Sequence, residues 1–184
     1  MPETSRFRNR SSKQLQKSNS AALAKRDRLL RKQLVWLLES GNAHADFNVA
    51  IAGLPANLRG AKPADCPYSP WQLLEHMRIA QWDILEFSQD PRHVTPDWPA
   101  GFWPKTKTST PPNPQAWNNS VRSFRQDLKA MQRLIADPAN DLFAPLPHGE
   151  GQTLLREALL LADHNSYHLG ELILVRRLLG AWPS

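Results

Sequence analysis

The stretch from Leu161 to Glu171, LADHNSYHLGE, places two histidines four residues apart inside a long run of helical apolar spacing. On an α-helix, residues i and i+4 lie one above the other on the same face. His164 and His168 can therefore bring two imidazole nitrogens to one point, which is the geometry that a divalent metal ion needs. A metal site then requires a third ligand from elsewhere in the chain.

Helical apolar spacing recurs in four segments, and no segment shows the alternating pattern of a strand. The predicted helices cover residues 21–54, 70–90, 115–136 and 152–179. A kink or interruption of the first helix is expected at Gly41-Asn42, and Leu54-Pro55 ends it. The pattern predicts an all-α fold, a four-helix bundle with long crossover connections.

Local signals fix the ends of two of these helices. Ser69 is a good N-cap, Pro70 suits the first helical position, and Gln72 completes a capping box. Thr153 is the expected N-cap of the last helix, and Gly180 supplies its C-terminal stop. The second and fourth helices are therefore expected to begin at defined residues.

The connection over residues 91–114 is rich in proline and aromatic residues. It has no periodicity, and a connection of this length is unusual in a compact domain. Trp98, Phe102 and Trp103 argue against a flexible linker, because such rings bury large apolar areas. We expect an ordered crossover that lies over the bundle.

The net charge of +6 comes from the N-terminal segment. Residues 1–32 hold ten Lys/Arg and two acidic residues, whereas the rest of the chain holds 13 basic and 15 acidic residues. The polar, aperiodic residues 1–20 are expected to be a disordered basic tail, followed by a single domain over 21–184. Nucleic acid is an unlikely partner, because the tail has almost no aromatic side chains to stack on bases.

Cysteine usage and hydropathy indicate the compartment. Cys66 is the single cysteine, so no internal disulfide can form, and the composition fits a reducing, cytoplasmic location. No run of about 18 apolar residues exists, so no membrane association is expected.

The third histidine of interest is His76, which lies on the inward stripe of the second predicted helix. In a four-helix bundle, facing helices can bring it toward His164 and His168. One metal bond and one outer hydrogen bond would satisfy each buried imidazole. On spacing alone, a metal site and a set of hydrogen-bonded core histidines are equally good readings.

Four neighbouring residues have weaker assignments. Glu171 lies on nearly the same helical face as the histidine pair and is a candidate catalytic base, a hydrogen-bond acceptor behind a ligand, or a solvated charge. His44 lies on the inward stripe of the first helix and is a second catalytic candidate, although a core or ligand-orienting role is favoured over metal binding. His148 is expected to be an exposed loop residue. Asn165 occupies the position where zincin proteases carry their general base, which argues against that class.

Two blocks, SPWQLLEHMRIAQWD at 69–83 and DHNSYHLGE at 163–171, resemble the DinB-like (YfiT-like) superfamily of four-helix bacterial proteins. The family pattern is one histidine in the second helix and HxxxH in the fourth, followed by a small residue. The resemblance covers residues 28–182. It implies that His76, His164 and His168 bind a divalent ion, often nickel or zinc, with open positions filled by water.

The resemblance also implies a class of activity. Some relatives are thiol-dependent transferases or isomerases that use low-molecular-weight thiols, and such bundles are often dimers. The expected function is therefore a metal-dependent thiol transferase or hydrolase with a small-molecule substrate, in a homodimer. The alternative is a non-catalytic metal-binding or stress-associated binding module, in which the same histidines hold the bundle together or sense metal.

Overall fold

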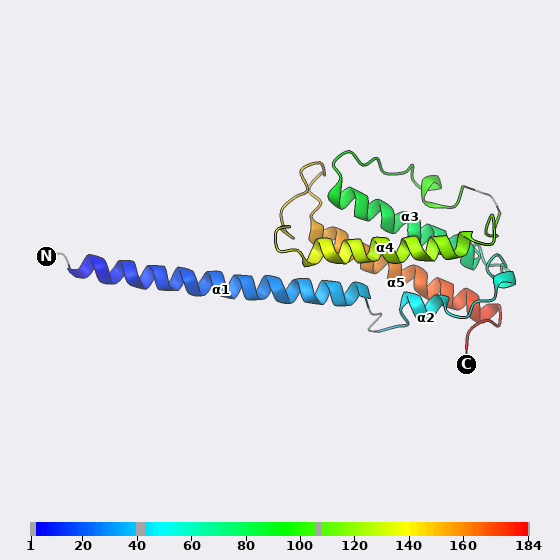
Figure 1. Cartoon of the computed structure of the whole chain (residues 1–184), viewed down its shortest axis with the longest axis horizontal. Helices are drawn as coiled ribbons and strands as arrows, with labels where there is room; N and C mark the ends of the chain where they lie inside the picture. Colours follow the sequence, from blue (N-terminus) through cyan, green and yellow to red (C-terminus); the bar gives the residue numbers. More distant parts are fainter. Residues whose placement is uncertain (1–2, 40–42, 106–107, 184) are drawn as a thin grey trace.

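The computed structural model describes residues 3–39, 43–105 and 108–183, and this part of the chain is helical without a strand (Figure 1). The all-α prediction is confirmed. The α-helices are α1 (Glu3–Glu39), α2 (Phe47–Ile51), α3 (Pro70–Gln89), α4 (Ala116–Ala136) and α5 (Leu154–Leu178). Two short 3-10 helices, η1 (Ala56–Leu58) and η2 (Ala100–Phe102), lie in the connections.

Four helices form the bundle. α3 packs against both α4 and α5, and the C-terminal part of α1 packs against the other side of the same two helices. One core cluster gathers around Trp71, Met77, Phe124 and Leu172, and a second around Leu34, Met131, Leu142 and Leu161. Burial of these side chains is the main stabilising term, because it removes large apolar areas from water.

The predicted helix starts are confirmed by their hydrogen bonds. The Gln72 backbone N–H donates to Ser69 Oγ over 3.3 Å, and the Ser69 N–H donates to Gln72 Oε1 over 3.1 Å, which is the predicted capping box. Thr153 caps α5 by accepting from the N–H of Arg156. At the other end of α5, Gly180 has a φ of +66°, a conformation that glycine adopts without strain.

The N-terminal segment differs from the expected disordered tail over residues 1–20. α1 begins at Glu3 and continues without a break to Glu39 (Figure 1). No glycine or proline interrupts this stretch, and Lys, Arg, Gln, Leu and Ala favour helix. The described side chains from 16 to 26 are all exposed, so local propensity and not packing holds this part.

The first predicted helix, over 21–54 with a kink or interruption, is divided into two helices in the structure. α1 ends at Glu39, and a separate short helix, α2, begins at Phe47. Asp46 is the reason for the new start, because its carboxylate accepts from the Val49 N–H over 2.8 Å and caps α2. The interruption expected at Gly41-Asn42 falls on residues outside the described part of the chain.

Two buried arginines tie the elements together through backbone carbonyls. Arg176 of α5 holds the segment after α2 and the C-terminal turn, since it donates to the carbonyls of Ala50, Ala52 and Ala181. Arg31 of α1 similarly binds the end of α4, at the carbonyls of Ile135, Asp137 and Asn140. Each guanidinium donates its hydrogen bonds to backbone carbonyls at or just after helix ends, where carbonyls lack partners within the helix.

The aromatic crossover lies along α3, as expected. Phe102 in η2 is buried and Trp103 is partly buried, whereas Trp98 is 77% exposed. The crossover thus delivers Phe102 and Trp103 to the flank of α3 that carries His76.

Candidate metal centre

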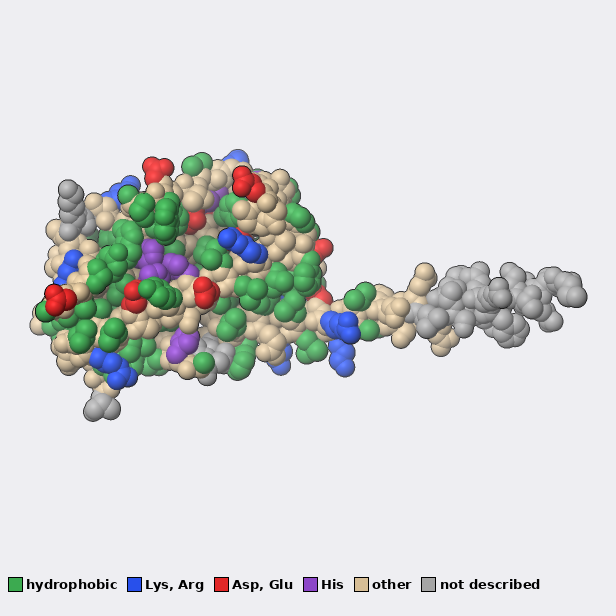
Figure 2. Space-filling model, turned by 180° about the vertical axis from the view of Figure 1, so that it is seen from behind, with side chains coloured by type: hydrophobic (Ala, Val, Ile, Leu, Met, Phe, Trp, Pro, Cys, Tyr) green, Lys and Arg blue, Asp and Glu red, His purple; other side chains and the backbone are tan. Residues whose placement is uncertain are grey.

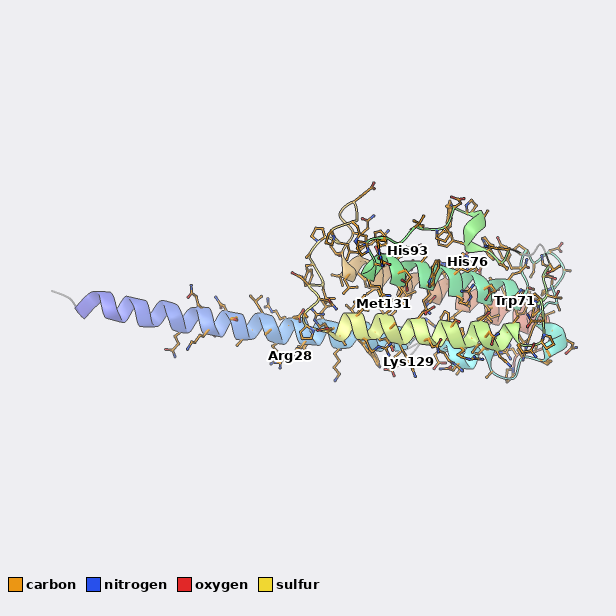
Figure 3. The ribbon with its side chains drawn as sticks, turned by 45° about the horizontal axis from the view of Figure 1, so that its top comes forward. Arg28, Trp71, His76, His93, Lys129 and Met131 are labelled. Atoms are coloured by element: carbon orange, nitrogen blue, oxygen red, sulfur yellow. The ribbon has the colours of Figure 1, made fainter. Side chains whose placement is uncertain are left out.

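Three histidines from two helices converge at one point. α3 supplies His76, which Figure 3 shows along that helix, and α5 supplies His164 and His168. The Nε2 atom of His76 lies 3.0 Å from Nε2 of His168 and 3.1 Å from Nε2 of His164. One ligand nitrogen from each ring lies within 4.8 Å of the others, so the cluster could hold a metal ion.

These nitrogen separations fit a shared ion. Two nitrogens that are each about 2.1 Å from one ion lie about 3.0 Å apart when the bonds are at right angles, and about 3.4 Å apart at a tetrahedral angle. The observed 3.0 and 3.1 Å correspond to the first case. The third separation, between the ligand nitrogens of His164 and His168, is within 4.8 Å. Three protein ligands would leave coordination positions on an ion open.

In two of the three rings, those of His76 and His168, a hydrogen bond on the far side from the centre determines which nitrogen carries the hydrogen. His76 Nδ1 lies 2.9 Å from the carbonyl oxygen of Phe102, and His168 Nδ1 lies 2.7 Å from a carboxylate oxygen of Glu171. Both oxygens can only accept, so both Nδ1 atoms donate. In the neutral rings, Nε2 then has a free lone pair directed at the centre, and such outer partners orient metal ligands.

Burial favours the neutral form of His164 and His76. Burial lowers the pKa of His164 to about 4, with the neighbouring His168 and His76 adding to the effect. Burial also lowers the pKa of His76, against an opposing contribution from its hydrogen bond to the Phe102 carbonyl. A neutral imidazole is the form that binds a metal ion, so these two rings could serve as ligands at neutral pH.

Aromatic rings wall the centre on two sides. Trp103 stacks on His76 with ring centroids 4.1 Å apart, and Tyr68 stacks on Trp103 with centroids 4.0 Å apart. Two rings that are both nearly parallel to one indole at this distance must occupy its opposite faces. Tyr167 is 65% exposed and meets His168 edge-on at 4.8 Å. The Glu171 carboxylate raises the pKa of the Tyr167 hydroxyl, both through its charge and as a hydrogen-bond partner.

Comparison with known proteins identifies the family. The sequence model of the DinB superfamily matches residues 42–172, which include α2 to α5 up to Leu172 and all three histidines. The chain belongs to the DinB superfamily. No curated protein and no solved structure matches it.

This DinB superfamily protein exposes its histidine cluster on one face. Figure 2 shows the histidines gathered at the surface, bordered by hydrophobic and acidic side chains. His76 is only 3% exposed, while His164 and His168 are partly accessible. A small molecule can therefore reach the centre from the α5 side. No helix in the described ranges combines the length and the apolar character needed to cross a membrane.

His44 does not lie where the sequence placed it. It is exposed, and its ring hydrogen-bonds the Ala45 carbonyl and Ser166 Oγ, each over 2.9 Å. The inward stripe of the first helix does not continue to this residue because α1 ends at Glu39. His44 is therefore neither in the core nor part of the histidine cluster, whereas Glu171 does reach the cluster through His168.

Two other histidines serve the fold. His148, expected to be an exposed loop residue, is half-buried and donates through Nε2 to the carbonyl of Phe87 in the last turn of α3. His93 lies 2.7 Å from an Asp83 carboxylate oxygen and fastens the crossover to α3.

Sequence reasoning missed the contribution of the crossover to the centre. The Phe102 carbonyl and the Trp103 ring both hold His76. The density of aromatic residues over 91–114 was a signal that this segment is ordered, but it carries no register that could place a particular ring.

Proposed function

We propose that this DinB superfamily protein is a divalent-metal-dependent enzyme whose ion is held by His76, His164 and His168. The proposal rests mainly on the Nε2 atoms of His76 and His168, which lie 3.0 Å apart. In the neutral rings both atoms have a lone pair directed at the centre. Two lone pairs so close repel each other unless a cation lies between them, and the lowered pKa of His76 disfavours a proton in that place. Nickel and zinc both suit a set of imidazole ligands.

The reaction class follows from the ligand set and its exposure. Three neutral ligands leave open positions on an ion, and a divalent ion there supplies Lewis acidity that lowers the pKa of a thiol or water molecule. The proposed activity is transfer of a low-molecular-weight thiol to a small electrophile, or hydrolysis. The open face beside Tyr167 is where such a substrate would approach.

Residues around the centre orient the proposed ligands and shield them from water. Glu171 holds the proton of His168 at Nδ1 and thereby keeps the Nε2 lone pair toward the ion. The stack of Tyr68 on Trp103 keeps the His76 ring in plane and shields it from water. The hydrogen bond to His168 supports Glu171 as the catalytic candidate, and the proposal gives His44 no role in the reaction.

The test joins metal analysis to an activity screen. Purified protein should contain about one divalent ion per chain, and His168→Ala should abolish binding. His44→Ala is the matched control, because it removes an exposed histidine outside the cluster and should retain the ion. The metal-loaded protein is then offered electrophiles with a panel of bacterial thiols, and esters and amides without thiol. Full metal occupancy in His168→Ala would refute the assignment of the ligands. A screen without turnover of any substrate would refute the proposed enzymatic activity.

A non-catalytic role has one observation in its favour. The cluster joins α3 to α5, so a bound ion would cross-link two helices of the bundle. In that case metal should raise the melting temperature while the screen shows no turnover and the ion shows no exchangeable water.

A further inference from the structure

The third imidazole of the cluster lacks the outer partner that the other two have. His164 Nδ1 is buried and, among the described residues, makes no hydrogen bond. When a metal ion occupies Nε2, a neutral ring must carry its hydrogen at Nδ1. A buried N–H without an acceptor is costly, so the bound state calls for an acceptor at this place.

The side chain of the next residue, Asn165, has a buried acceptor that lacks a donor in the described part of the chain. Asn165 is 8% exposed, and its Oδ1 is buried with no hydrogen-bond partner among the described residues. Asn165 directly follows His164 in α5, so the two buried, unpaired atoms belong to consecutive side chains. One unpaired acceptor thus lies beside one nitrogen that needs an acceptor.

The orientation of the Asn165 amide is fixed by two further groups. Gln81, which is fully buried, donates through Nε2 to the Phe124 carbonyl oxygen over 2.6 Å. That carbonyl can only accept, so Gln81 must turn its Oε1 the other way, where it accepts from Asn165 Nδ2 over 3.1 Å. Asn165 has then used its nitrogen, and its oxygen is the atom left for His164.

We infer that Asn165 is the positioning residue for His164, held in the accepting orientation by Gln81 and by the backbone of α4. The inference rests on the proposed metal binding. It gives every ligand an outer acceptor: the Phe102 carbonyl, the Glu171 carboxylate and the Asn165 amide oxygen. It also gives α4, which supplies no ligand, a part in the centre through the Phe124 carbonyl. Outer partners of this kind typically change metal affinity about 10–100-fold.

The test removes both amides of the relay together. In Gln81→Leu/Asn165→Leu, both amides become apolar side chains of similar shape, so the metal-free protein should fold with a melting temperature close to that of the wild type. Its zinc affinity, measured against a chromophoric chelator, should fall about 10–100-fold. The variant Gln81→Leu/Asn165→Asp restores an acceptor oxygen for His164. The leucine at position 81 presents no oxygen that would repel the new carboxylate, so the zinc affinity should recover. The absorption spectrum of the cobalt-loaded forms should change and recover in parallel.

A second measurement uses the unmodified chain. In zinc-loaded protein with ¹⁵N-labelled histidine, His164 should carry its hydrogen on Nδ1, in slow exchange with solvent. Wild-type zinc affinity in Gln81→Leu/Asn165→Leu, or a His164 bound through Nδ1, would overturn the relay while leaving the metal centre in place. Wild-type protein that binds neither zinc nor cobalt would instead refute the proposed function, and with it this inference.

Discussion

At the scale of single residues, Glu171 connects His168 of the histidine cluster to the rim of the site. Its carboxylate accepts from His168 Nδ1 and raises the pKa of the Tyr167 hydroxyl. Glu171→Ala should weaken zinc binding about 10–100-fold, because the His168 ring loses its orienting acceptor. Glu171→Gln keeps an oxygen that can accept and should lose less affinity, while the pKa of Tyr167 falls toward its ordinary value.

Chelator competition and a spectrophotometric titration of tyrosine measure these two effects separately. Glu150→Gln is a suitable control, since it removes an exposed loop carboxylate remote from the cluster. Equal zinc affinity in Glu171→Ala and Glu150→Gln would show that His168 does not depend on Glu171.

The buried histidines also make the metal-free protein sensitive to acid. The pKa of His164 is lowered from 6.5 to about 4, and that of His76 is lowered as well. Between these values the unfolded chain binds more protons than the folded one, so the free energy of unfolding falls as the pH falls. Stability should be fully present above pH 6.5 and decline progressively toward pH 4.

Thermal melts of metal-free protein across this range would measure the decline. His164→Asn removes one of the two titrating rings and should flatten the slope between pH 6.5 and 4. A melting temperature that is constant over this range in the wild type would contradict the burial argument.

The sequence could predict the residues of the centre that depend on local periodicity, and not those that depend on the path of the crossover. Helical spacing puts His164 and His168 on one face and His76 on the inward stripe of its helix. That these three residues act together was implied by the resemblance to the DinB-like superfamily, not by the spacing. Phe102 and Trp103 reach the same point through an aperiodic segment, whose course depends on tertiary packing. His44 was misplaced for a related reason, because a register read across the end of a helix has no physical basis.

At the scale of elements, α1 consists of two parts with different sources of stability. Its C-terminal part buries Leu34 in the core and fastens Arg31 to the end of α4. Its N-terminal part extends away from the bundle (Figure 1), and the described side chains from 16 to 26 are exposed. A helix without tertiary contacts is only marginally stable in water, so the two parts should respond differently to heat.

Removal of residues 1–20 tests this division. The truncated protein should melt within about 2 °C of the full chain, since the described side chains of the removed segment are exposed and their loss changes the unfolding free energy little. Its zinc affinity should be unchanged. Circular dichroism of the full chain should show gradual loss of helix below the main transition, and the truncated protein should lack that phase. A large drop in melting temperature would mean that the projecting part stabilises the bundle.

At the scale of the whole molecule, the centre joins α3 and α5 at a point where the bundle is open to solvent. The capping and core packing of both helices are independent of an ion, so the fold should form without metal and gain stability with it. This differs from small domains that fold only around their metal. Helix caps and apolar stripes depend on residues that are near one another in the sequence. The bundle could therefore be predicted from the sequence.

Metal-linked stabilisation gives the corresponding measurement. Free zinc at about 100 times its dissociation constant should add about 2.7 kcal/mol to the free energy of unfolding. For a domain of this size that amounts to a rise of roughly 5–10 °C in the melting temperature. His76→Ala should remove the rise because the link to α3 is lost, whereas His44→Ala should keep it. A rise of the same size in His76→Ala would mean that zinc acts elsewhere on the chain and that the two helices are not joined through it.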